Sequence, residues 1–346
     1  MTIEEEEKIF YHAISASTGG NYATIRRAIR GCESWEQAHE RLPNGGKVSD
    51  PETEWKKLVD QNIQLVLRED ERFPLLLREI PHPPFGIYVR GTLPTNDALG
   101  IAVVGTRRAT PDGKNTARRF AAELARAGIV IVSGLAFGVD AAAHEGCLNA
   151  GGKTLAVLAC GLANIYPKNN EALAEKIIAQ GGAIISEYPP DMPAYPSRFL
   201  ERNRIVSGLS KGTLVIEAPE RSGSLATARF ALEQNRDVFV IPGQITHPNF
   251  KGSHELIRQG AELVTTPEHI LAAEGMLKED KKMLDTSELA PEEALVVHFL
   301  RESGAAQDID KISVAAKLQP HIANQTVSFL LIKGMISERG DGYVIN

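Results

Sequence analysis

The chain has 346 residues, of which 43% are hydrophobic and 24% charged, and its formal net charge is -6 at pH 7. Such a length predicts two or three domains, and the composition is typical of a folded globular protein. An acidic total excludes a chain that attracts nucleic acid through its overall charge, so nucleic-acid binding would need a local basic patch. Of the segments 1–99, 100–270 and 271–346, only 100–270 has a positive balance, of two charges.

Cysteines and apolar runs bear on the cellular compartment. Cys32, Cys147 and Cys160 are far apart and form no C-x-x-C pair, so neither a disulfide framework nor a zinc site is predicted. No apolar run approaches the roughly 20 residues that cross a bilayer. The acidic start M-T-I-E-E-E-E is unlike a secretory leader. We therefore expect a cytoplasmic protein with no membrane contact, no metal and no cofactor.

The first 62 residues are expected to form a small helical domain. Isoleucines recur along an apolar face up to residue 42, and the turn T-G-G-N separates a first helix from a second. The second helix carries Arg26, Arg27 and Arg30. Two interpretations stay open, a helix-hairpin-helix or sterile-alpha-motif-like module that touches nucleic acid, and a helical docking domain without that role. A linker is expected over residues 42–50.

From residue 101 a pattern of strand, glycine turn and helix repeats. The apolar runs are short and continuous, which is typical of strands covered on both faces. Strands are expected at 101–104, 129–132, 154–158, 183–185, 214–217, 238–241 and 263–264, with a further one at 63–67, and helices at 114–127, 141–150, 170–179 and 225–234. The pattern predicts an α/β domain over residues 63–274, with a doubly wound, mostly parallel, extended Rossmann-like sheet.

The C-terminal part is expected to be a separate domain. Residues 275–289 are charged and weakly patterned, which indicates a linker. Within residues 290–346, helices at 291–303, 310–317 and 322–333 and a hairpin of 335–338 with 343–345 describe a winged helix. The third helix has only Lys333 as a cation, whereas a helix that reads a DNA groove usually brings several. A protein-contacting role is therefore at least as well supported as duplex reading.

Ligands of a doubly wound sheet bind beyond the carboxyl ends of its strands. Five stretches are expected to meet there, at residues 105–113, 133–144, 160–170, 198–210 and 220–228. The first stretch lacks G-x-G-x-x-G and no acidic residue ends the second strand, so dinucleotide binding is disfavoured. Cations and backbone N–H groups at helix starts recur instead, and these hold phosphate groups. A polyphosphate-like ligand is therefore predicted.

The cations of this edge are expected from three stretches. Arg107 is favoured over Arg108 because it is closer to the strand end. Lys168 lies on the loop of the third stretch. In the fourth stretch, Arg198, Arg202 and Arg204 follow four prolines and are expected on a loop, since proline fixes φ and removes a donor.

Small and polar residues complete the predicted edge. Ser133 and Gly134 close a strand, and Ser222, Gly223 and Ser224 precede a helix, where they either bind phosphate or, in the case of Ser224, cap the helix. Asp140 and His144 are four residues apart, which suits a base with its orienting partner or a pair of metal ligands. The favoured interpretation is structural, with Asp140 as a cap and His144 packed.

The motifs resemble those of the DNA-processing protein A family (DprA, also called Smf). The resemblance covers roughly residues 60–270 and rests on G-T-R at 105, S-G-L-A-F-G-V-D-A-A-A-H at 133, G-L-A-N-I-Y-P-K-N-N at 161, F-L-E-R-N-R-I-V-S-G-L-S at 199, S-G-S-L-A-T-A at 222 and V-I-P-G at 240. It implies a non-enzymatic protein that binds single-stranded DNA without sequence preference. It further implies that the protein loads the RecA recombinase during natural transformation, is a homodimer through its α/β domain, and has single-strand-binding protein as a further partner.

The resemblance also implies roles for individual residues. Phosphate contacts fall to Arg107, Lys168, Arg202 and Arg204, with Ser133, Gly134, Asn203, Ser222, Gly223 and Ser224 in the same pocket. Phe199 offers a ring on which a base stacks. A basic groove with an aromatic platform is how single strands are held without sequence readout.

Two rival interpretations remain at this point. The α/β region also resembles the phosphoribohydrolases often named lysine decarboxylases, whose P-G-G-x-G-T-x-x-E motif falls on S-G-S-L-A-T-A. The carboxylate of that motif would be Phe230, and glycosidic cleavage without its carboxylate is hard to run. The second rival is a nucleotide-sensing module with a winged-helix output, which the absent ribose carboxylate disfavours.

Overall fold

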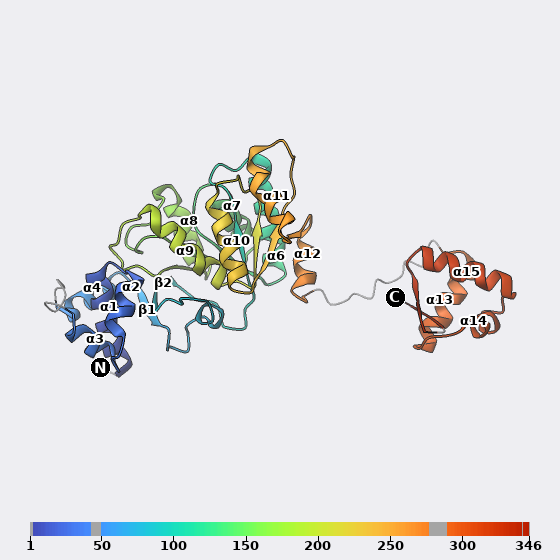
Figure 1. The fold of residues 1–346 in the computed structure, drawn as a ribbon, viewed down its shortest axis with the longest axis horizontal. Helices are drawn as coiled ribbons and strands as arrows, with labels where there is room; N and C mark the ends of the chain where they lie inside the picture. Colours follow the sequence, from blue (N-terminus) through green and yellow to red (C-terminus); the bar gives the residue numbers. More distant parts are fainter. Residues whose placement is uncertain (1–2, 43–49, 277–288, 341, 346) are drawn as a thin grey trace. The chain divides into compact units, whose positions relative to one another are not determined.

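The computed structural model describes residues 3–42, 50–276, 289–340 and 342–345. Its contacts separate into two compact units, Met1–Glu274 and Gly275–Asn346 (Figure 1). Apart from their ends, the linkers predicted over residues 42–50 and 275–289 lie outside the described residues. Among the helices that are described, none is long and apolar enough to cross a membrane.

Four helices begin the first unit: α1 (Ile3–Thr18), α2 (Tyr22–Ile29), α3 (Trp35–Glu40) and α4 (Pro51–Asp60). Asn21 caps α2, since its side chain accepts a hydrogen bond from the backbone N–H of Thr24. The helices do not close a core of their own. Tyr11 and Trp35 pack in one cluster with Tyr88 of the sheet. Because the helices and the sheet share this cluster, a separate domain over residues 1–62 stays a prediction.

A sheet of nine strands forms the centre of the first unit, in the order β1-β2-β6-β5-β4-β3-β7-β8-β9. Its strands are β1 (Gln64–Leu67), β2 (Gly86–Gly91), β3 (Gly100–Val104), β4 (Val130–Ser133), β5 (Thr154–Leu158), β6 (Ala183–Ser186), β7 (Gly212–Val215), β8 (Asp237–Val240) and β9 (Glu262–Leu263). All neighbours pair in parallel except β1 with β2 and β2 with β6. The predicted doubly wound, mostly parallel sheet is confirmed. Strand β2 was not predicted, because the prolines and glycine before it favour a loop.

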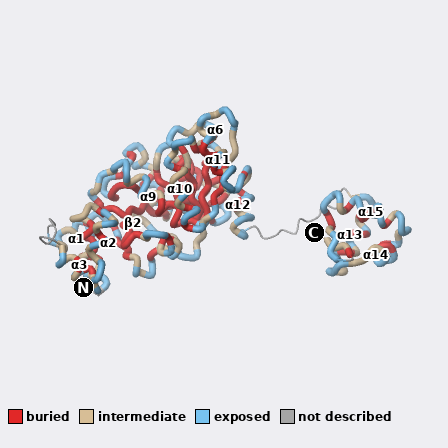
Figure 2. The backbone as a smooth tube through the Cα atoms, in the orientation of Figure 1, coloured by how far each residue is buried: buried red, intermediate tan, exposed pale blue. Residues whose placement is uncertain are grey.

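Helices cover both faces of the sheet. Alternate residues of β3 show this, since Ala102 and Val104 pack in one core cluster while Ile101 and Val103 pack in another. The first cluster lies against α5 (Leu75–Arg78), α9 (Pro196–Gly208), α10 (Gly223–Glu233) and α11 (Lys251–Arg258). The second lies against α6 (Pro111–Arg126), α7 (Val139–Asn149) and α12 (Pro267–Ala273), and α8 (Glu171–Ala179) packs nearby on β5 and β6. Burial of each large aliphatic side chain stabilises the folded protein by about 1.5–3 kcal/mol. The sheet is the most buried part in Figure 2, so its side chains form the core that stabilises the unit.

The fourth predicted stretch is a helix, so the loop prediction for residues 198–210 is wrong. Helix α9 begins at Pro196, where a helix needs no backbone N–H, and Tyr195 before it is extended (φ -124°, ψ 148°). Ile205 and Val206 are buried against the sheet. The last of the four prolines is therefore the first residue of the helix, and apolar contacts with the sheet stabilise the residues that follow.

In the second unit, the described residues form three helices and a hairpin: α13 (Pro291–Ser303), α14 (Ile309–Ala315), α15 (Pro320–Ile332), β10 (Ile336–Arg339) and β11 (Gly342–Ile345). Its core includes Leu300, Ile312 and Leu330. Gly304 ends α13 in the left-handed region, with φ 60°, which glycine adopts without strain. The predicted C-terminal helices and hairpin are confirmed.

Candidate functional site

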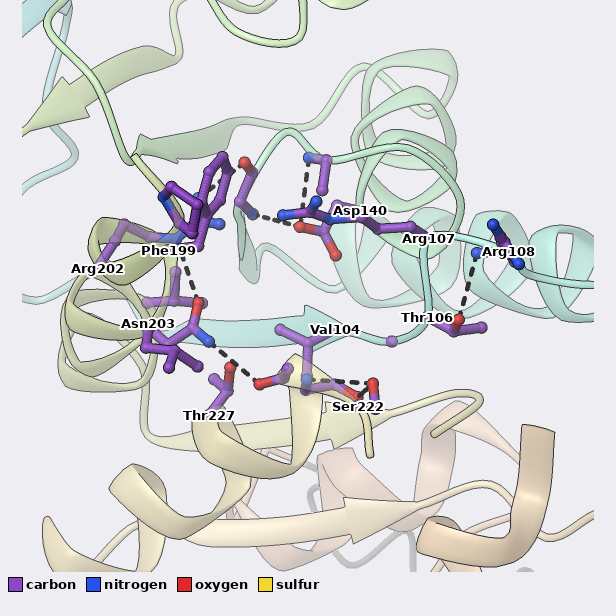
Figure 3. A pocket seen from close by; sticks show the side chains of 18 of the residues that line it. Val104, Thr106, Arg107, Arg108, Asp140, Phe199, Arg202, Asn203, Ser222 and Thr227 are labelled. Atoms are coloured by element: carbon purple, nitrogen blue, oxygen red, sulfur yellow. Dashed lines mark hydrogen bonds between the residues drawn. The ribbon is translucent and has the colours of Figure 1, made fainter. Parts of the chain in front are cut away.

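A cavity of about 620 Å³ lies at the C-terminal edge of the sheet. It is lined by the end of β3 and by the loops that follow β3 and β7, between which the strand order reverses. Such a switch point is where open α/β sheets bind ligands. All five predicted stretches contribute to it. The lining includes Arg107 and Arg108, Gly134 and Asp140, Tyr166, then Phe199, Arg202 and Asn203, and finally Arg221, Ser222, Gly223, Ser224 and Thr227 (Figure 3).

An arginine and two aromatic rings stand together in the cavity. The guanidinium carbon of Arg107 lies 4.6 Å from the ring centroid of Phe199. The ring of Tyr166 meets that of Phe199 edge-on, at 5.8 Å and 65°. Tyr166 is 49% exposed, and Arg107 is exposed as well. The group therefore presents a cation and ring surfaces to solvent side by side, and the cation–π contact contributes roughly 0.5–1 kcal/mol at such a site.

Arg202 is a buried cation beneath this group. It is 4% exposed, and its Nη1 donates to the carbonyl oxygens of Gly134, at 2.8 Å, and of Val157. A Cβ at Gly134 would lie 2.5 Å from Nη1 of Arg202, so a larger residue there would displace the guanidinium from these carbonyls. Burial lowers the pKa of Arg202, and Asp140 partly offsets this. Arg202 thus fastens α9 to the strand ends, and its remaining surface lines the cavity.

Asp140 and His144 have structural partners. Asp140 Oδ2 accepts from the backbone N–H of Gly134 at 3.1 Å and of Ala136 at 3.4 Å. Thr154 Oγ1 donates to a backbone carbonyl, so the Nδ1 of His144, 2.7 Å away, carries the proton that bonds it. Burial lowers the pKa of His144 to about 3, so the imidazole is neutral. The packed, structural role favoured for His144 agrees with these contacts. Asp140 is structural as well but is not the predicted cap, because Gly138 precedes α7 without a side-chain cap and Asp140 holds the loop before the helix instead.

Three of the predicted site residues do not line the cavity. Ser133 is fully buried, and its hydroxyl donates to the carbonyl of Val103 at 2.6 Å. Lys168 is exposed at the start of a short 3₁₀ helix. Arg204 forms a buried ion pair with Glu187, at 2.6 and 2.7 Å. Residues two apart on a helix point in nearly opposite directions, so Arg202 and Arg204 cannot form one wall as predicted.

The lining residues that were not predicted include Arg108, Tyr166 and Arg221. Arg107 was favoured over Arg108, yet both line the cavity. Tyr166 lies in the loop after β5, directly before Pro167. An aromatic residue in a loop at the strand ends was the signal in the sequence that could have identified it. At the start of α10 the cap is Ser222, which accepts from the N–H of Ser224 at 3.3 Å, so the capping role considered for Ser224 was wrong.

Comparison with known proteins decides the family. Residues 64–275 match the model of DNA recombination-mediator protein A, which is more than half of the chain. The chain belongs to this family. This membership confirms the predicted resemblance. The name of the family describes its members as mediators of recombination.

Two relatives show how much of the chain is shared. Protein Smf of Escherichia coli is 46% identical over 214 residues, which cover 62% of this chain and 57% of that protein. The chain thus spans little more than half the length of this relative. The putative DNA processing protein DprA of Mycobacterium tuberculosis is 35% identical over 303 residues, covering 82% and 77%.

Two solved structures of DNA processing protein A are also similar to this chain. The X-ray structure of DNA processing protein A from Streptococcus pneumoniae is 34% identical, with a TM-score of 0.63, and covers 79% of this chain and 98% of that one. A second structure, of DNA processing protein A from Helicobacter pylori, concerns the single-stranded DNA binding mode of that protein. It is 34% identical with a TM-score of 0.54 and covers 61% of this chain and 94% of that one.

The hydrolase alternative loses its chemical basis at this cavity. Phe230, the position of the hydrolase carboxylate, does not line it. Among the described residues, Asp140 is the one carboxylate in the lining, and it already accepts from two backbone N–H groups. Burial raises the pKa of Asp140, while Arg202 opposes that rise. The position of Asp140 is explained by support of the loop after β4.

Proposed function

We propose that this protein binds single-stranded DNA in the cavity at the C-terminal edge of its sheet, without reading the base sequence. The observation that carries the proposal is the group of Arg107, Phe199 and Tyr166. It combines an exposed cation with ring surfaces, in a chain of the recombination-mediator family. The Helicobacter pylori relative, whose single-stranded DNA binding has been described, supports the same ligand.

The chemistry of the cavity suits a phosphodiester strand better than a free nucleotide. Arg107, Arg108 and Arg221 are exposed at its rim and can each pair with a phosphate. Bases have π-faces whatever their identity, so stacking on Phe199 or Tyr166 adds about 1–3 kcal/mol per base without selecting a sequence. Ser222 and the N–H groups at the start of α10 add neutral donors.

We further propose that the protein works as a cytoplasmic homodimer that loads RecA recombinase onto the strand, in the presence of single-strand-binding protein. One cavity with three rim cations binds weakly by itself. Two cavities on one strand gain affinity because the second binding event occurs at a high effective concentration. The loading role is supported by membership of the recombination-mediator family.

Oligonucleotide binding at several salt concentrations tests the DNA site. Three phosphate contacts predict that the logarithm of the binding constant falls with the logarithm of salt with a slope of about -2. The triple variant Arg107→Ala, Arg108→Ala and Arg221→Ala should flatten that slope and weaken binding, with the fold intact by circular dichroism. If the triple variant binds as tightly as the parent at low salt, this cavity is not the DNA site.

Two further assays test the loading role and the absence of enzyme activity. RecA filaments should assemble faster on single strands coated with single-strand-binding protein when this protein is added. No acceleration would leave a binder without a loading role. Incubation with nucleoside monophosphates should release no free base, and release would instead support the hydrolase alternative.

A further inference from the structure

A second basic groove lies outside the cavity, along helix α2. Its volume is about 780 Å³, and it is lined by Arg26, Arg27 and Arg30 together with Arg68 and a set of rings. Each of the three arginines of α2 is exposed. We call this the α2 groove. It contains more arginines than the rim of the cavity, although the first 99 residues have no excess of basic side chains.

The spacing on α2 explains why the three arginines share a face. Ile25 is buried, whereas positions 26, 27 and 30 lie on the opposite side, three and four residues apart. Like charges at such spacings repel each other by a few tenths of a kcal/mol per pair. A cluster of this kind gains stability when an anion neutralises it. A bound polyanion therefore relieves the repulsion among the three arginines of α2.

Aromatic rings line the same groove. Tyr22 stacks on Phe85 at 5.3 Å, and the ring of His82 meets Tyr22 edge-on at 5.9 Å. His82 is exposed and has a left-handed backbone, with φ 58°, which is uncommon for a residue other than glycine. Prolines stand on both sides of it, so the loop holds its ring against the groove at a cost in backbone strain.

Helix α9 connects the α2 groove to the cavity. Its residues Phe199, Arg202 and Asn203 line the cavity. The guanidinium of Arg204, the next residue of α9, lies 5.6 Å from the ring centroid of Tyr22. Tyr22 lines the α2 groove. Arg198, near the start of α9, donates to the carbonyl of Gly19 at 3.0 Å, just before α2. The helices that line the two basic-aromatic sites are thus joined by direct contacts.

We propose that the α2 groove is a second binding site for single-stranded nucleic acid, which takes a further segment of the strand held in the cavity. The arginines of α2 bind phosphates, and the exposed ring of His82, held against Tyr22, offers a surface to an unpaired base. A duplex would use the arginines but leave the His82 ring without a partner, so a single strand fits the full set. The inference rests on the proposed function in that both sites receive the same strand.

Oligonucleotide length separates the two sites. A strand of about 8 nucleotides fills one site, since sites on single strands cover about 4–16 nucleotides, whereas one of about 40 reaches both. The triple variant Arg26→Ala, Arg27→Ala and Arg30→Ala should leave the affinity for the short strand within twofold. It should weaken the long strand about tenfold and reduce its salt slope by about 2.

A matched control removes the same charge elsewhere. Arg126, Lys153 and Arg258 are exposed, line neither site, and can be changed together to alanine. This control should leave the binding of both strands nearly unchanged. An equal loss in the control, or no loss for the long strand in the α2 variant, would overturn the second site. Loss of short-strand binding only in the cavity variants would keep the proposed function whatever the α2 result.

The rings are tested with His82→Ala, which removes an exposed side chain. On the long strand it should weaken binding about threefold, and on a strand of abasic spacers of the same length it should have no effect. An equal loss on both strands would show that His82 contacts the backbone only. If a duplex of equal length competes as well as the single strand for the α2 groove, the single-strand part of the inference is wrong.

Discussion

Helices α9 and α2 use arginine in opposite ways. On α9, Arg202 is buried and its Nη1 donates to backbone carbonyls, while Arg204 is paired with Glu187. In the α2 groove, Arg26, Arg27 and Arg30 are exposed on one helix face. The number of arginines in a stretch of sequence therefore does not give the number of phosphate contacts. Burial decides whether a guanidinium holds the protein together or remains available to a ligand.

The largest expected effect comes from breaking the buried pair. Arg204→Ala leaves the Glu187 carboxylate without its partner, and such a change costs about 3–5 kcal/mol of stability. Urea unfolding measures this loss. The double variant Arg204→Met with Glu187→Leu should recover much of it, because no buried charge is left unpaired. A stable Arg204→Ala protein with weakened DNA binding would instead return Arg204 to the list of phosphate contacts.

A pH effect follows from the buried imidazole beside Arg202. The pKa of His144 falls from 6.5 to about 3 in the folded protein, first because of burial and second because of Arg202. Below pH 6.5 the unfolded chain therefore binds a proton that the folded chain excludes, and stability decreases as the pH falls. The loss is about 2 kcal/mol by about pH 5.

The His144→Gln variant isolates this effect, since it lacks the titrating group. Urea unfolding of both proteins between pH 7 and pH 5 should show the parent losing stability faster. Parallel curves would mean that His144 titrates in the folded state as it does in the unfolded chain.

The exposed cations should affect binding rather than stability. Arg107→Ala is expected to weaken the binding of short single strands by about 1.4 kcal/mol, or tenfold, because it removes one phosphate contact. Fluorescence anisotropy with a short labelled strand measures this. Lys168→Ala is the control, since it removes one exposed charge outside the cavity. An effect of Lys168→Ala as large as that of Arg107→Ala would mean that the bound strand extends beyond the cavity lining.

The smallest effect is expected at an exposed ion pair. Arg258 and Glu255 are 3.3 Å apart on α11, with side chains 79% and 51% exposed. Such pairs contribute about 0.3–0.5 kcal/mol, so Arg258→Ala should hardly change the urea midpoint. A loss comparable to that of Arg204→Ala would contradict the distinction between buried and exposed arginines.

The sequence by itself determined the fold class and the edge at which the site lies. Short, mostly apolar runs such as 154–158 predict strands covered on both faces, and glycine turns after them predict where the strand ends meet. These signals are local, because periodicity and turn chemistry act over a few residues. The three C-terminal helices and the hairpin were predictable for the same reason.

Only the tertiary structure decided what each side chain does. The sequence could not tell that Arg204 faces Glu187, 17 positions away, or that Arg202 bonds the carbonyl of Gly134 across the sheet edge. It also could not join Tyr166 to Phe199, or Tyr22 to Phe85. Such contacts depend on how separate elements pack. The roles of the arginines therefore followed from burial and partners, which no spacing along the chain records.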